Sequence, residues 1–186
     1  MLESANYYLV VDLEATCDDR GAVPRDESEI IEIGAVLVDG VTLRSVGEFQ
    51  MFVRPIIHPT LTRFCTELTT ITQIDIAAAP GFVDVARRLA AFGDGALFCS
   101  WGNYDRNQLG ADARRHGIES PLGPRHLNIK AEFARHAGER KRGNRDAMTR
   151  VGLTSTGTHH RGIDDARNIA RLLPFALGQA EIPEAR

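Results

Sequence analysis

The stretch YLVVDLEATC, residues 8–17, decides how the rest of this sequence is read. Its first half is aromatic and β-branched, which predicts a buried central strand over residues 7–13. Asp12 and Glu14 lie two residues apart at the end of that strand, so their side chains share one face of the sheet. Two carboxylates this close repel each other unless a cation lies between them, and Mg²⁺ prefers oxygen ligands. The stretch therefore predicts a metal site, although the same pattern is common on solvated strand ends.

Composition indicates one globular domain over residues 1–186. The chain is 43% hydrophobic, enough to bury a substantial core. Its net charge of −3 gives no chain-wide attraction for nucleic acid, so a polyanion would have to be held by local features. Arginine far outnumbers lysine, which fits phosphate binding but also fits a GC-rich genome.

The cysteines and the N-terminus bear on location. Cys17, Cys65 and Cys99 are scattered and form no CxxC pair, so a disulfide framework or a structural zinc site is not expected. The N-terminal residues lack a signal-peptide pattern, and no apolar run is long enough to span a bilayer. We therefore expect a cytoplasmic protein that does not associate with a membrane.

Hydrophobic patterning predicts alternating strands and helices. Asp39-Gly40 favours a tight hairpin turn, Pro174 is expected to end or kink the last helix, and residues 138–150 look loop-like before a weak helix. Residues 126–129 fit either a fifth strand or the start of a helix through residue 137. The other strands are expected at 7–13, 29–38, 42–54 and 96–100, and the other helices at 60–68, 80–92, 105–116 and 163–177. This order predicts an α/β fold, a mixed sheet flanked by helices.

Two further acidic positions strengthen the metal-site hypothesis. Asp105 begins a predicted helix directly after a predicted strand, and Asp165 lies in the first turn of the last helix, five residues after His160. Each has a simpler explanation, because a carboxylate at a helix start interacts favourably with the helix dipole. Asp164 competes with Asp165 for the same role.

Taken together, Asp12, Glu14, Asp105, His160 and Asp165 resemble the motifs of the DEDDh 3′–5′ exonuclease family. The family's H-x-x-x-x-D spacing selects His160 over His159 and Asp165 over Asp164. The segments VDLEATC, EIIEIGAVLVD, FCTELTTITQ, FCSWGNYDRNQL and HHRGIDDARNIARLL are similar to the branch that contains the histone-mRNA 3′-exonuclease and the exoribonucleases that limit RNA interference. The resemblance implies an RNase H-like fold with a mixed five-stranded sheet.

The resemblance also implies a mechanism. Two divalent cations, Mg²⁺ or Mn²⁺, would be held by Asp12, Glu14, Asp105 and Asp165, with Asp12 shared between them, and would clamp the attacking and leaving oxygens of a phosphoryl displacement. His160 would be the general base, since its ordinary pKa lies near neutrality. The expected reaction releases 5′-mononucleotides from the 3′ end of single-stranded nucleic acid, with RNA favoured over DNA.

The last nucleotide needs a pocket of its own. Main-chain groups around Ala15 and Thr16 would receive the terminal sugar hydroxyl, while Phe64 would stack on the terminal base beside Leu68 and Tyr104. Phe64 fits an ordinary core aromatic equally well, and Trp101 is expected in the core. Glu32 is expected either to orient the site or to be solvated at a strand edge.

Three alternatives remain open on the sequence alone. The same fold could trim or proofread DNA, the groove could bind without cutting, or the acidic residues could form a surface with no metal. The basic run GERKRGNRDAMTR departs from the family's more apolar pattern, and it either follows upstream phosphates or is a solvated face. A recruiting protein is possible, but no residue identifies one.

Overall fold

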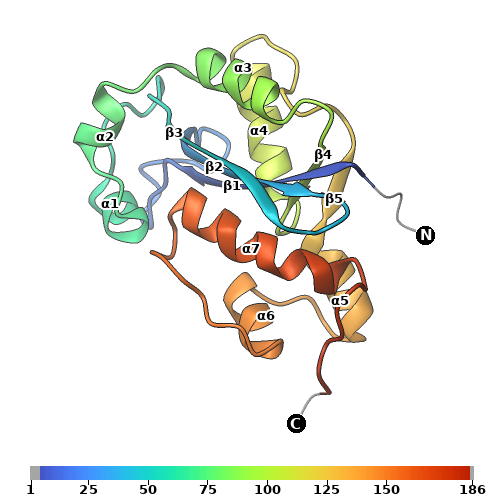
Figure 1. Cartoon of the computed structure of the whole chain (residues 1–186). Coiled ribbons are helices and arrows are strands. Elements are labelled where there is room, and N and C mark those ends of the chain that lie inside the picture. The colour runs from blue at the N-terminus through green and yellow to red at the C-terminus, as the bar shows by residue number, and fades with distance from the viewer. Residues whose placement is uncertain (1–4, 185–186) are drawn as a thin grey trace.

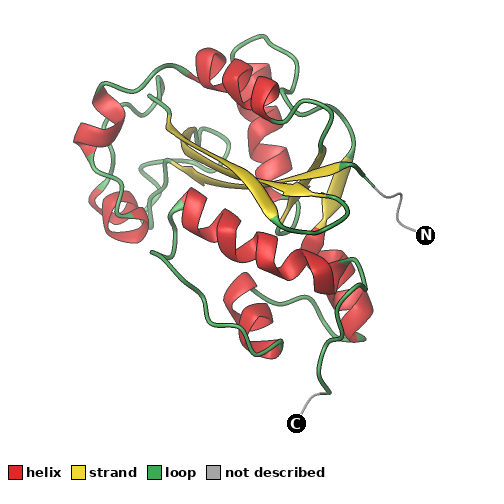
Figure 2. Cartoon of the chain, in the orientation of Figure 1, coloured by secondary structure: helices red, strands yellow, loops and turns green. Residues whose placement is uncertain are grey.

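A mixed five-stranded sheet forms the centre of the computed structural model, which describes residues 5–184 (Figures 1 and 2). The strands lie in the order β3-β2-β1-β4-β5. The central β1 pairs antiparallel with β2 and parallel with β4, and β5 continues the parallel side. The strands are β1 (Tyr7–Ala15), β2 (Ile30–Asp39), β3 (Ser45–Phe52), β4 (Leu97–Ser100) and β5 (His126–Asn128). The expected five-stranded mixed sheet is confirmed.

Helices cover both faces of the sheet (Figure 1). One face packs against α3 (Phe82–Phe92) and α4 (Tyr104–Arg115). The other packs against α5 (Ile129–Ala137), α6 (Asn144–Arg150) and the long α7 (Gly162–Ala176). The short α1 (Arg63–Thr69) and α2 (Gln73–Ala77) lie at one end of the sheet.

The alternation of β1 divides its side chains between two cores. Leu9, Val11 and Leu13 belong to the core under α3 and α4. Tyr8 and Val10 belong to the core under α5, α6 and α7. Because every second residue shares a face, Asp12 and Glu14 continue the row of Tyr8 and Val10 on the α7 side. The strand thus delivers both carboxylates to the edge of an apolar layer.

A close backbone contact fixes the start of α7 on the sheet. A Cβ on Gly34 of β2 would lie 2.0 Å from the carbonyl carbon of Gly162. Only a residue without a side chain allows this approach. A Cβ on Gly162 would in turn lie 2.9 Å from the main-chain oxygen of Asp12. The first turn of α7 is therefore held directly over the acidic end of β1.

The structure corrects several expected elements. The turn after Asp39 spans more than a two-residue hairpin, because the Asp39 amide donates to the Arg44 carbonyl and Leu43 has a φ of 52°. Residues 126–137 form both a strand and a helix, and the basic run contains α6. The segment after α1 adds α2, which was not expected. Pro174 lies inside α7, two residues before its end, so the helix continues past it although proline removes one main-chain donor. Within residues 5–184, no helix is both long and apolar enough to cross a bilayer.

Candidate active site

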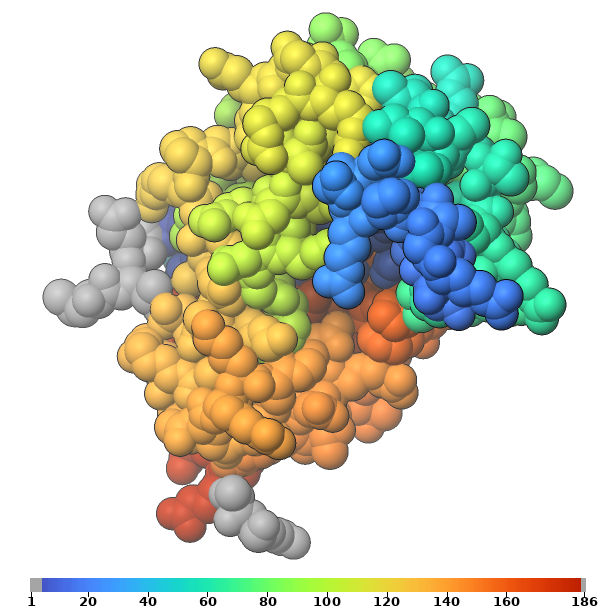
Figure 3. Space-filling model, turned by 180° about the vertical axis from the view of Figure 1, so that it is seen from behind, coloured from blue at the N-terminus to red at the C-terminus, as the bar shows by residue number. Residues whose placement is uncertain are grey.

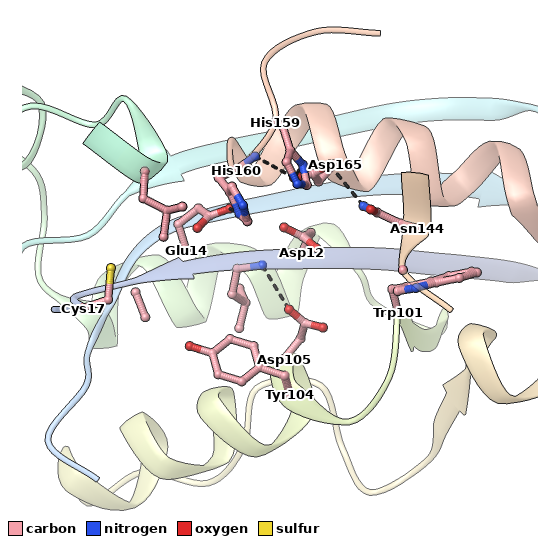
Figure 4. Close-up of a pocket in the computed structure, with 14 residues that line it drawn as sticks. Asp12, Glu14, Cys17, Trp101, Tyr104, Asp105, Asn144, His159, His160 and Asp165 are labelled. Atoms are coloured by element: carbon pink, nitrogen blue, oxygen red, sulfur yellow. Dashed lines mark hydrogen bonds and ion pairs between the residues drawn. The ribbon is translucent and has the colours of Figure 1, made fainter. Parts of the chain in front are cut away.

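The four acids expected at the metal site meet in one pocket of about 500 Å³ (Figures 3 and 4). On the surface, the hollow lies where the segment after β1, the start of α4 and the segments around α6 and the start of α7 come together (Figure 3). The lining residues are Asp12, Leu13, Glu14, Ala15, Cys17, Leu68, Trp101, Tyr104, Asp105, Gly143, Asn144, His159, His160 and Asp165.

Two of the acids come from β1 and one from α7. Carboxylate oxygens of Asp12, Glu14 and Asp165 all lie within 4.8 Å of one another. Asp12 pairs with Gly34 across the sheet and Glu14 pairs with Glu32, after which the register of β1 and β2 shifts. The close approach of Gly34 to Gly162 is thus what brings Asp165 over β1. A strand end and a helix start build the cluster together.

Asp105 joins from the opposite side of β1. It lies in the first turn of α4 and is only 4% exposed. Its Oδ1 accepts a hydrogen bond of 3.2 Å from the Leu13 amide, which ties the start of α4 to the end of β1 (Figure 4). This hydrogen bond fixes the position of the carboxylate in the pocket, so its role is more than that of a charge at a helix start.

Asp165, rather than Asp164, points into the pocket. Its Oδ2 accepts from the His160 amide at 2.9 Å, and its Oδ1 accepts from Asn144 Nδ2 at 3.1 Å. Asp164 instead accepts from the Thr158 amide at 2.8 Å and pairs with Arg167. The spacing of the third motif thus selects the residue that the structure places in the pocket.

Both histidines of the HH pair lie in the pocket. His160 Nδ1 is 4.0 Å from Glu14 Oε1, and His159 Nδ1 is 3.2 Å from Asp165 Oδ2. Their ring centroids are 3.9 Å apart. The motif spacing gives His159 no catalytic role, yet its ring lines the same pocket. The reason is the backbone of His160, whose φ of 60° turns consecutive side chains to the same side.

Burial and mutual repulsion perturb the acids strongly. Burial, followed by repulsion from Asp105 and Glu14, raises the pKa of Asp12 well above its ordinary value. Burial and the nearby Asp165 raise the pKa of Glu14 to about 8, and burial raises that of Asp105 to about 6. Such a cluster binds a cation favourably, because a positive charge relieves the repulsion. All-oxygen donors at this spacing fit a hard divalent ion.

A buried ion pair supports the site from behind. Glu32 is 0% exposed, so the solvated alternative for this residue is wrong. Its Oε2 accepts from Arg161 Nε and from the Gly162 amide, each at 3.1 Å, and its Oε1 accepts from Gln50 Nε2 at 2.7 Å. These bonds hold the residues between His160 and Asp165 against β2. Glu32 therefore orients the third motif.

The residues expected around the terminal nucleotide divide between two hollows. Ala15, Leu68 and Tyr104 line the pocket with the acids. Phe64 and Thr16 line a neighbouring hollow of about 480 Å³, which shares Cys17 and Tyr104 with the first. Thr16 is held away because its hydroxyl accepts from the Glu29 amide at 2.9 Å. The structure does not bring Phe64 or Thr16 against the acids.

Sequence reasoning missed several lining residues. Trp101 packs on Phe133 with ring centroids 5.9 Å apart, as a core residue would, yet it also lines the pocket. Asn144 and Gly143 enter from the start of α6, which was expected to be loop-like. No sequence motif marks Asn144, because its hydrogen bond to Asp165 exists only in the folded chain. The adjacent pair His159 and His160 was visible in the sequence, and it was the one available signal that a further residue lines the pocket.

Comparisons with known proteins agree with this geometry. The model of the exonuclease family, RNase_T, matches residues 9–173. ERI1 exoribonuclease 3 of Mus musculus is 32% identical over 90% of this chain and 52% of its own length. The 3′–5′ exonuclease eri1 of Schizosaccharomyces pombe is 31% identical over 90% of this chain and 66% of its own. The chain thus spans about half the length of the first of these relatives.

Solved structures show the same fold. The nuclease domain of 3′hExo, a DEDDh family member bound to rAMP, has a TM-score of 0.87 and 27% identity and covers 98% of each chain. A 3′-exonuclease that recognises the histone mRNA stem-loop has a TM-score of 0.86 at 26% identity, over 94% of this chain and 65% of that one. The expected RNase H-like fold is confirmed. The chain therefore belongs to the RNase_T exonuclease family and, within it, to the DEDDh members that include the ERI1 exoribonucleases.

Proposed function

We propose that this chain is a metal-dependent 3′–5′ exonuclease that removes 5′-mononucleotides from the end of single-stranded RNA. One observation carries the proposal: carboxylates from β1, α4 and α7 meet a histidine in one solvent-open pocket. A relative named as an exoribonuclease, ERI1 exoribonuclease 3, supports RNA over DNA. The residues described here would act as a single exonuclease domain.

The carboxylates would hold two divalent cations, Mg²⁺ or Mn²⁺. Asp12, Glu14 and Asp165 offer oxygens close enough to share an ion, and Asp105 faces them across β1. Bound cations would supply positive charge to the phosphate oxygens on which negative charge grows during cleavage. The protein's own contribution is position, since Leu13, Asn144 and the His160 amide fix two of the carboxylates.

His160 would accept the proton of the attacking water. Burial and the neighbouring His159 lower its pKa, so the imidazole is neutral near pH 7 and can accept a proton. Its side chain is 40% exposed, so water can reach the ring. Glu14, 4.0 Å away, would stabilise the imidazolium once it forms.

The 3′-terminal nucleotide would lie between the acids and the adjoining hollow. The main chain at Ala15 and Thr16 would meet the terminal sugar hydroxyl. Tyr104 is 55% exposed and borders both hollows, which suits stacking on a base. Phe64 would contact the base from the second hollow, and Leu68 would line the first.

We place the reaction in the cytoplasm. Cys17, Cys65 and Cys99 are all free thiols, which fits a reducing compartment.

The test is an end-labelled trimming assay. With Mg²⁺, a 5′-labelled single-stranded RNA should shorten stepwise from its 3′ end and release 5′-monophosphates. A 3′-phosphate should block the reaction, because it occupies the place of the terminal hydroxyl. A circular RNA should resist, and Asp12→Asn should be inactive. Cutting of the circle would contradict an exonuclease, faster trimming of the matched DNA would indicate a DNA enzyme, and no cutting at all would indicate a binding module.

A further inference from the structure

The HH pair presents two imidazoles side by side. In an extended chain, neighbouring side chains point to opposite sides. Here the left-handed backbone of His160 places both rings on one side, 32° from parallel. A non-glycine residue in this conformation carries backbone strain, and such strain concentrates at functional sites.

The surrounding loop holds this arrangement. Gly157 has a φ of 76°, and a Cβ there would lie 2.3 Å from Asp164 Cγ. The Asp164 carboxylate accepts from the Thr158 amide at 2.8 Å, and the His160 amide donates to Asp165 at 2.9 Å. The loop is thus fastened to the first turn of α7 on both sides of His159. The rings do not depend on each other to stay in place.

Asp165 completes a three-residue group with these rings. Ligand atoms of His159, His160 and Asp165 all lie within 4.8 Å of one another. His159 Nδ1 is 3.3 Å from Asp165 Oδ1 and 3.2 Å from Oδ2, roughly the ligand–ligand separation in a tetrahedral zinc shell. To complete this shell, only the His160 side chain would need to rotate toward the other two ligands. Its exposure of 40% allows that rotation.

We propose that His159, His160 and Asp165 bind Zn²⁺ at a second site, which shares only Asp165 with the all-carboxylate cluster. Two imidazoles and one carboxylate, with an open fourth position, suit a borderline-soft ion far better than Mg²⁺. Asn144 donates to Asp165 at 3.1 Å and orients the carboxylate, as residues behind a metal ligand commonly do. Asp12 and Glu14 offer only oxygens and would keep their preference for a hard ion.

Because the two sites share Asp165, an ion in one site weakens binding in the other. Zn²⁺ bound by the histidines withdraws Asp165 from the carboxylate cluster and removes the lone pair that His160 needs to accept a proton. The ion would therefore inhibit RNA trimming even in excess Mg²⁺. This consequence rests on the proposed exonuclease function, whereas Zn²⁺ binding itself does not.

The test is a calorimetric Zn²⁺ titration of the purified chain without RNA or Mg²⁺. We expect one tight site per chain, weakened at least tenfold in His159→Ala. The matched control is His58→Ala, because His58 also contacts a carboxylate, Glu27, at 2.9 Å, but has no second histidine beside it. That variant should bind Zn²⁺ as the wild type does, and Asp12→Asn, which removes only a neighbouring charge, should weaken binding much less than His159→Ala. X-ray absorption should show two nitrogen ligands at about 2.0–2.1 Å.

Several outcomes would overturn the site. They are unchanged binding in His159→Ala, loss of binding in Asp12→Asn, or a shell of oxygens alone. Circular dichroism of each variant separates lost ligands from lost folding. Because the titration contains no RNA, it reads the zinc site even if the chain proves to have no exonuclease activity, and the trimming assay in Mg²⁺ tests that activity separately.

Discussion

His160 combines two features that a general base needs. Its pKa is lowered by burial and by His159, which keeps the ring neutral, and it lies beside Glu14 at 4.0 Å. His160→Ala should therefore lower turnover by about 10²–10⁴-fold, the usual scale for losing a general base. Mg²⁺ affinity and KM for RNA should change little, since the carboxylates remain. Steady-state kinetics together with calorimetric Mg²⁺ titration would measure the difference.

The comparison variant for this prediction is His58→Ala, which removes an imidazole that does not line the pocket and should retain full turnover. His159→Ala is less neutral, because its ring contacts Asp165. We expect an intermediate loss there. If His159→Ala abolished turnover while His160→Ala preserved it, the base would be assigned one residue too late.

At this scale the sequence predicts the acids but not their neighbours. Strand alternation is enough to place Asp12 and Glu14 on one face, and the motif spacing selects Asp165 over Asp164. The position of His159 depends on a left-handed backbone at His160, a non-glycine residue, which no local pattern encodes. Asn144 reaches Asp165 only through the tertiary path of the chain. Residues whose place depends on packing were therefore missed.

The contact between β2 and α7 is an element-level test of how the site is held. In Gly34→Ala, the new methyl group would meet main-chain atoms of Gly162 and Ile163 at 2.0–2.3 Å, and neither can move without shifting the helix. We expect a loss of about 1–3 kcal/mol or more in the free energy of unfolding. Trimming activity should fall further than stability alone explains, because Asp165 moves with α7. Thermal unfolding and kinetics at a temperature where the variant is folded would show both.

Gly81→Ala is the matched control, since a Cβ on Gly81 meets nothing within 4 Å and its φ is −71°. It should change stability by less than about 1 kcal/mol, in keeping with the mild cost of alanine for glycine at a helix N-cap. Equal losses in the two variants would show that the contact does not position α7.

The basic run before and within α6 borders the pocket through Gly143 and Asn144. Arg142 and Arg150 both pair with one carboxylate, Glu139. In the described chain, by contrast, Arg140, Lys141 and Arg145 have no carboxylate within salt-bridge range. Replacing Arg140 and Lys141 with alanine should raise KM for long single strands and reduce the salt slope by about 1 for each lost phosphate contact. The control is Arg88→Ala on α3, across the sheet, which should leave KM and the salt slope unchanged. If the double variant kept the wild-type salt slope, Arg140 and Lys141 would be solvated and would not contact phosphates.

Element prediction succeeded where periodicity is strong. β1 and β2 are nearly continuous apolar runs, and α3 has a clear apolar stripe. It failed where tertiary packing overrides local preference. α6 buries only Ala147 and Met148, yet these join the core under α7 and stabilise a helix in a polar run. α7 continues past Pro174 because Leu172, Leu173 and Ala176 are buried on either side of it.

At the scale of the whole molecule, the order of elements along the chain predicted a mixed sheet but not the spatial order of its strands. Three consecutive antiparallel strands and two strands reached through helices can be joined without crossing only in a few mixed sheets. The observed order β3-β2-β1-β4-β5 places β1 in the middle, where the carboxyl end of a parallel strand lies beside a helix start. The site therefore arises from topology, and the acids of distant segments meet without any long-range signal in the sequence.

The same cluster predicts how stability depends on pH and metal. Burial and the nearby acids raise the pKa of Glu14 from 4.5 to about 8, and burial raises that of Asp105 from 3.8 to about 6. Between about pH 4.5 and 8, the folded metal-free protein then holds more protons than the unfolded chain. The free energy of unfolding contributed by these groups must fall as pH rises through that window. With a chelator present at pH 8, the wild type should therefore unfold at a lower temperature than a variant in which such a carboxyl is replaced by a neutral group.

Glu14→Gln isolates this contribution, because it removes one repelled charge while keeping the side chain's size. In a chelator at pH 8 we expect the variant to unfold at a higher temperature than the wild type, and the gap to close near pH 5, where the wild-type carboxyl is protonated. Mg²⁺ should raise the wild-type unfolding temperature more at pH 8 than at pH 5.5, since the ion competes with protons for the same oxygens. Asp18→Asn is the control: backbone hydrogen bonds from Ala22 and Arg20 lower the pKa of this exposed carboxyl, so its removal should not stabilise the fold at pH 8. If Glu14→Gln were no more stable than the wild type at pH 8 without metal, the carboxylates would not repel one another in the folded protein. Repulsion would then give no reason to expect a cation between them.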